Sequence, residues 1–179
     1  MPALLTAYGG VDVKLMNEDL LSIARYAAKQ LQTEEIVAFA DRNLTKGVYS
    51  DYLLAIIDEE NKVWELVSAL FESAVKDLGY DIPCFEEAIM GLIRHHLTLI
   101  AEEKVEPWEQ FRILLFDIDE FDLHENITSY VGDSIGIESL YGWFHAIDDV
   151  DSESDLIKIK KGLISESKIW LEKHPCNKA

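Results

Sequence analysis

Five carboxylates lie within residues 114–125, a segment that contains no Lys or Arg. Closely spaced oxygen ligands are what Ca²⁺ requires, and an EF-hand loop places them at fixed positions. A loop that begins at Asp117 needs an oxygen ligand at its fifth position, Gly at its sixth and Glu at its twelfth. The sequence has Phe121, Asp122 and Thr128 at those positions. The spacing does not fit a calcium loop, and we expect neither a metal nor a cofactor.

The histidines offer one acid–base arrangement. Neither Glu-x-x-His nor His-Glu-x-x-His, the patterns of helical di-iron and zinc sites, occurs in the sequence. On a helix His95 and His96 point about 100° apart, and His96 falls on an apolar stripe, which favours a buried structural role. His145 is followed at helical spacing by Asp148 and Asp149. Asp149 could orient His145 as a general base, which keeps an enzyme among the alternatives.

The negative charge of the chain is concentrated in one block. The 179 residues have a net charge of −18. Residues 102–155 hold 16 acidic and two basic side chains, a net charge of −14, whereas residues 156–179 have a net charge of +4. Nucleic acids and anionic membranes attract cationic proteins, so we expect neither as a partner.

We predict that the acidic block, residues 102–155, recognises a basic protein partner. Clustered charge of one sign speeds association with a partner of the opposite sign. Phe116, Phe121 and Leu123 alternate with the acids and would anchor such an interface. The simplest alternative is a solvated face that only aids solubility. The predicted partner-binding residues are Asp117, Asp119, Glu120, Asp122, Glu125, Asp133, Asp148, Asp149 and Asp151.

The elements that position these residues are predicted to be helices. Apolar residues recur at helical spacing through most of the chain, most clearly from Val63 to Leu78, where Gly79 stands at the expected helix end. No sustained alternation or hairpin turn indicates a strand. We therefore expect one all-α domain over residues 1–179, with eight or nine helices in a bundle or in stacked helical hairpins.

Capping residues and prolines mark the predicted helix starts. They are Asn17, Ser50 and Asn61 as caps, Pro83 and Pro107 as first-turn prolines, and Ser152, which with Asp155 resembles a capping box for a helix that runs to about Lys173.

The cellular compartment is predicted from what the sequence lacks. No apolar run approaches the roughly 18 residues that a bilayer requires, and the first 15 residues have no basic signal-peptide region. Cys84 and Cys176 match no metal-binding or redox spacing. We expect a cytoplasmic protein with two free thiols.

Residues 38–120 contain a Gly-x-x-Ser-x-x-Leu element, then an amphipathic helix that ends in Leu-Gly, then a helix opened by proline. The matching positions are Gly47, Ser50, Leu53, Leu78, Gly79 and Pro107. This arrangement resembles small acidic all-helical bacterial immunity proteins, the partners of polymorphic or contact-dependent toxins. The resemblance implies a binding protein without catalytic residues.

Together, the charge pattern and the resemblance predict a non-enzymatic cytoplasmic inhibitor. It would neutralise a cationic, nuclease-type toxin domain by covering its basic surface. Three alternatives stay open: an acidic nucleic-acid mimic or regulator-binding protein that uses the same acids, a helical enzyme with its site around His145 and Asp149, and a homo-oligomeric scaffold.

Overall fold

A computed structural model describes residues 16–122 and 134–175 of the chain. Within these ranges every regular element is a helix and none is a strand. The all-α fold class is therefore confirmed. The contacts divide the chain into two compact units, whose boundary lies between Ile89 and Met90 within helix α5 (Phe85–Ala101). A single domain over residues 1–179 stays a prediction.

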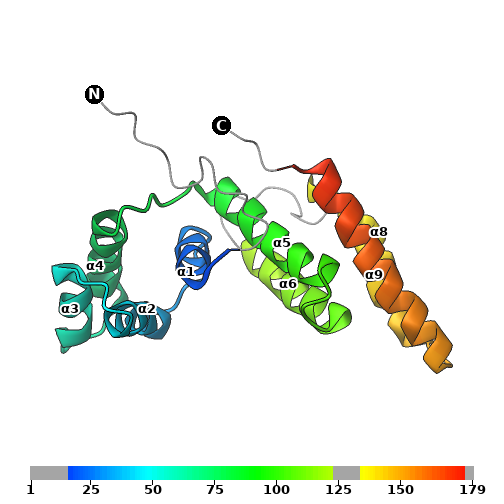
Figure 1. Ribbon diagram of the computed structural model, residues 1–179, viewed down its shortest axis with the longest axis horizontal. Helices are drawn as coiled ribbons and strands as arrows, with labels where there is room; N and C mark the ends of the chain where they lie inside the picture. The colour runs from blue at the N-terminus through cyan, green and yellow to red at the C-terminus, as the bar shows by residue number, and fades with distance from the viewer. Residues whose placement is uncertain (1–15, 123–133, 176–179) are drawn as a thin grey trace. The chain divides into compact units, whose positions relative to one another are not determined.

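The first unit is built around four helices. They are α1 (Glu18–Ala27), α2 (Thr33–Thr45), α3 (Asp51–Asp58) and α4 (Trp64–Asp77). Helices α2, α3 and α4 pack against one another, and α1 packs against α2 (Figure 1). The Phe39 and Phe71 rings meet edge to face with centroids 5.0 Å apart, and Tyr26 lies 4.9 Å from Phe71. Such aromatic pairs add about 0.5–1.5 kcal/mol to the free energy gained from burying the rings.

Two predicted helix caps of the first unit are confirmed. The Asn17 side chain accepts hydrogen bonds from the Asp19 and Leu20 amides, and Ser50 accepts one from the Tyr52 amide. Each bond satisfies an amide that has no partner within its own helix. Gly79 has φ +80°, the left-handed conformation expected just beyond a helix end.

The predicted cap at Asn61 is wrong, because α4 begins at Trp64 with Val63 as its N-cap. The segment between the two helices instead contributes Lys62, whose side chain caps the C-terminal end of α3. Lys62 Nζ donates to the carbonyl oxygens of Ile56, Ile57 and Glu59 at 3.0–3.2 Å. An ammonium group at this end of a helix is favourable, because the carbonyls there lack partners and the helix dipole is negative.

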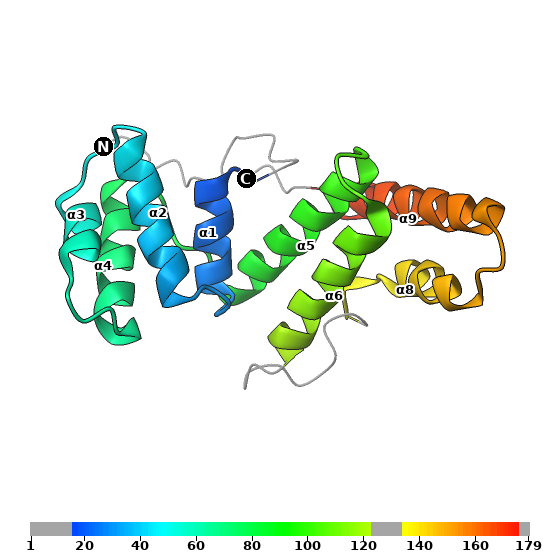
Figure 2. The same ribbon diagram turned by 90° about the horizontal axis from the view of Figure 1, so that it is seen from below.

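The second unit contains the other helices that the structure describes, including most of α5. Beyond α5 they are α6 (Pro107–Asp122), α8 (Glu138–His145), the 3-10 helix η1 (Ala146–Asp149) and α9 (Glu153–Lys173). Helix α8 lies along α9, and α6 also contacts α9 (Figure 2). The Trp170 indole N–H donates to the Ile135 carbonyl at 2.8 Å. Arg94 of α5 donates to the His174 carbonyl and lies 5.8 Å from the centre of the Trp170 ring, which ties α5 to the end of α9.

The three helix starts predicted from residue 83 onwards agree with the structure in two cases. Helix α6 begins at Pro107, and Ser152 caps α9, as predicted. Helix α5 begins at Phe85, so Pro83 lies before it and not in its first turn. There the Cys84 amide is satisfied by the Glu87 carboxylate at 3.1 Å, a contact that opens the helix after the proline.

Candidate functional site

Helix α6 carries most of the acidic segment noted in the sequence, and its helical period sorts that segment into two faces. Phe111, Leu114, Ile118 and Phe121 are buried in the unit, at most 1% exposed. The anchor role predicted for Phe121 is therefore wrong, because its ring is already packed inside the chain. Leu123, the third predicted anchor, lies outside the described residues.

The opposite side of α6 exposes two large apolar groups. Phe116 is 65% exposed and Ile113 is 45% exposed. Helical spacing places charged residues around them. We call this surface the α6 outer face, and it comprises Glu109, Arg112, Ile113, Phe116, Asp119 and Glu120.

The acids of the outer face differ in whether a base neutralises them. Glu109 forms an ion pair with Arg112 at 3.0 Å. Asp119 and Glu120 are exposed, and no basic group of the described residues lies within 4.0 Å of either carboxylate. The outer face thus has a neutralised end at Glu109 and a negatively charged end beside Phe116.

The charged end also opposes the dipole of its own helix. Asp119 and Glu120 lie in the last turn of α6, which contains no basic residue. A helix C-terminus is electronegative, so each carboxylate there costs about 0.3–1 kcal/mol. A local rule broken without a structural reason is typical of a site kept for function.

Asp117 does not belong to the outer face. Its carboxylate accepts a hydrogen bond from His96 Nε2 on α5 at 3.0 Å. The Gln110 amide nitrogen donates to His96 Nδ1, so the imidazole proton sits on Nε2 and points at Asp117. His96 is 7% exposed, which confirms its predicted buried role. The residues of this Gln110–His96–Asp117 network are up to 21 positions apart, and no sequence pattern joins them.

The other predicted partner-binding acids lie on different segments. Asp148 in η1 and Asp151 just after it are exposed. The backbone of Asp122 and Asp149 is helical, but their side chains are not among the described parts. Glu125 and Asp133 lie outside the described residues. Of the nine predicted residues, the structure brings Asp119 and Glu120 together with an exposed apolar anchor.

His145, the centre of the alternative acid–base site, packs its imidazole ring against aromatic side chains. The His145 ring stacks on Tyr141 with centroids 6.3 Å apart and lies edge-on to Phe144. Phe144 in turn stacks on Trp108, with centroids 5.2 Å apart. This row of rings connects α6 with α8. The side chain of Asp149, the predicted partner of His145, is not among the described parts, so the His145–Asp149 pairing stays a prediction.

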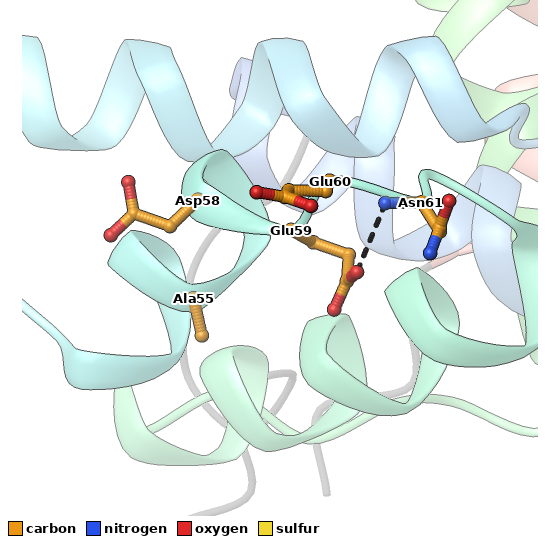
Figure 3. A pocket seen from close by; sticks show the side chains of 5 residues that line it. All are labelled: Ala55, Asp58, Glu59, Glu60 and Asn61. Atoms are coloured by element: carbon orange, nitrogen blue, oxygen red, sulfur yellow. Dashed lines mark hydrogen bonds between the residues drawn. The ribbon is translucent and has the colours of Figure 1, made fainter.

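A second acidic feature lies at the end of α3. An open hollow of about 450 Å³ is lined by Ala55, Asp58, Glu59, Glu60 and Asn61 (Figure 3). Glu59 turns back to accept a hydrogen bond from the Asn61 amide at 3.1 Å, and Asp58 points away from it. Throughout the described ranges, no group of three or more His, Cys, Asp or Glu side chains is arranged to hold a metal ion.

The chain was compared with protein-family models, curated proteins and solved structures. No family model, curated protein or solved structure matches the chain. Among the described residues, no helix has both the length and the apolar character needed to cross a membrane.

Proposed function

We propose that this chain is a non-enzymatic binding protein whose α6 outer face recognises a basic protein. The observation that carries the proposal is the 65% exposure of Phe116 beside Asp119 and Glu120, which no base of the described residues neutralises. The outer face exposes Phe116 together with Ile113, three residues away on the same helix face, and an exposed apolar group rimmed by charges favours an interface over a purely solvated face.

The two kinds of side chain have separate tasks in the proposed interface. Phe116 and Ile113 enter an apolar depression of the partner and exclude water from the contact, as aromatic anchors do in protein interfaces. Asp119 and Glu120 pair with Lys or Arg groups around that depression. Their charge mainly speeds association, whereas the buried ring mainly slows dissociation.

In its finer form, the proposal is that the partner is a cationic toxin domain of the nuclease type. Such a domain needs Lys and Arg groups to hold its nucleic-acid substrate. An acidic protein that covers those groups abolishes substrate binding by occlusion, without any chemistry of its own. The chain would then be an immunity protein, in line with the resemblance of residues 38–120.

The test uses a basic protein recovered from the native host by pull-down with the full chain, or one found to be encoded by a gene adjacent to that of this chain. Its association and dissociation rates are measured with the full chain, with Phe116→Ala, and with the double variant Asp119→Lys/Glu120→Lys. We expect Phe116→Ala to raise the dissociation rate by about tenfold or more, as loss of an aromatic hot spot does. We expect the double variant to slow association, and the slowing to diminish as salt is added.

A matched control keeps the total charge change equal. Asp77→Lys/Glu172→Lys also reverses two exposed carboxylates near helix C-termini, on α4 and α9. This control should bind with nearly the wild-type association rate. Equal slowing by both double variants would show that only net charge matters, and an affinity unaffected by Phe116→Ala would contradict the α6 outer face as the interface.

A further inference from the structure

The segment 46–53, which comprises the connector between α2 and α3 and the start of α3, exposes two tyrosines. Tyr49 in the connector is 68% exposed and Tyr52 in the first turn of α3 is 43% exposed. The segment contains the Gly-x-x-Ser-x-x-Leu element of the sequence. Helix geometry explains that element, because Gly47 has φ +80° after α2, Ser50 caps α3 and Leu53 is fully buried. It does not explain the tyrosines.

The connector holds Tyr49 in one place. The Val48 amide donates to the Asn43 carbonyl at 3.0 Å, which anchors the chain to the end of α2. The Tyr49 hydroxyl then donates to Asp51 Oδ1 at 2.8 Å. Side chains that are already ordered in the free protein lose little conformational entropy when they bind a partner.

The resulting group has the chemistry of a guanidinium site. The faces of tyrosine rings attract cations. Asp51 is exposed, and no basic group of the described residues lies within 4.0 Å of its carboxylate. The bond from Tyr49 uses one carboxylate oxygen and leaves the other to accept from a ligand. A planar guanidinium both stacks on an aromatic ring and pairs with a carboxylate, which a compact ammonium group does less well.

We infer that segment 46–53 binds an arginine side chain of a protein partner. Tyr49 supplies the stacking surface and Asp51 accepts the guanidinium N–H groups, while Tyr52 is the second exposed tyrosine of the segment. The site belongs to the first unit, whereas the α6 outer face belongs to the second. The inference therefore stands or falls independently of the proposed function.

A titration of the ¹⁵N-labelled full chain, followed by NMR, tests the inference. The probes are the blocked peptide acetyl-Gly-Arg-Gly-amide and its citrulline counterpart, which has the same shape without the charge. At about 0.15 M salt, where long-range attraction is screened, we expect the arginine peptide to shift the amides of Tyr49, Asp51 and Tyr52. The citrulline peptide should leave them in place. The amides of Asp58 and Glu60, exposed acids without a neighbouring exposed tyrosine, are the internal reference.

Three variants separate the contributions. Tyr49→Ala and Asp51→Asn should each weaken binding of the arginine peptide about two- to fivefold, the range of an exposed cation–π or ionic contact. The matched control Asp58→Asn, at the other end of α3, should bind as the wild type does. Equal shifts with citrulline, shifts as large at Asp58 and Glu60, or unchanged binding by both Tyr49→Ala and Asp51→Asn would each overturn the inference.

Discussion

His96 on α5 donates a hydrogen bond to the Asp117 carboxylate on α6 at 3.0 Å. This contact and the burial of Phe111, Leu114, Ile118 and Phe121 agree on the rotation of α6 about its axis. With Asp117 turned towards α5, the helical period directs Phe121 inwards and Phe116 to the surface. The packed apolar face and the His96–Asp117 bond together leave Phe116, Asp119 and Glu120 at the surface.

Asp117→Ala should lower the free energy of unfolding by about 1–3 kcal/mol, because the buried His96 N–H loses its acceptor. Urea denaturation measures the change. The matched control is Glu120→Ala, three residues on and exposed, which should not lower the free energy of unfolding. Equal effects of the two variants would mean that the His96–Asp117 bond contributes nothing to stability.

Neutralising the charged end of the α6 outer face should stabilise the free protein. The double variant Asp119→Asn/Glu120→Gln removes two carboxylates from the electronegative end of the helix, a gain of about 0.3–1 kcal/mol for each. Glu109→Gln, in the first turn of the same helix, should have the opposite sign, since it also removes the ion pair with Arg112. The melting temperatures of the double variant and of Glu109→Gln, measured at low salt and compared with wild type, test these two opposite changes in stability. A loss of stability in the double variant would contradict the dipole argument.

Gly162→Ala should destabilise the packing of α8 on α9. A Cβ at Gly162 would lie 2.2 Å from the Trp143 ring, so the indole or the helix must move. Overpacking of this kind costs about 1–3 kcal/mol. Gly142→Ala, in the interior of α8 with no atom within 4 Å of the added carbon, should instead stabilise by about 0.5–1 kcal/mol. Equal stabilities of the two variants would show that α8 and α9 do not approach closely at Gly162.

His95 should make the folding stability depend on pH. Burial, and secondarily the neighbouring His96, lower the pKa of His95 from its ordinary value of 6.5 to about 4. Between these two values the unfolded chain binds a proton that the folded chain does not, so the free energy of unfolding falls as the pH decreases. The stability that the protein has at neutral pH from keeping His95 uncharged is therefore lost by about pH 4.

The variant His95→Gln tests this by removing the titrating group. Its unfolding free energy, measured by urea denaturation between about pH 7 and pH 4, should fall less steeply than that of the wild type. Parallel pH profiles for wild type and His95→Gln would contradict the lowered pKa.

Local signals in the sequence determined the helical fold and several of its helix ends. Asn17, Ser50 and Ser152 were recognisable as caps because a cap acts on amides only two or three residues away. Pro107 was recognisable because a proline suits a first turn. The same reasoning failed at Asn61 and Pro83, where Lys62 and Glu87 make the contacts that place the neighbouring helix end.

The sequence also revealed the acidic block, but only the tertiary structure decided which of its side chains are exposed. Asp117 and Asp119 are alike in the sequence, yet one bonds His96 and the other faces outwards. Phe116 and Phe121 are equally apolar, yet one is 65% exposed and the other 1%. The physical reason is that exposure depends on which residues from distant positions pack against each side of a helix, and a charge tally carries no record of those contacts.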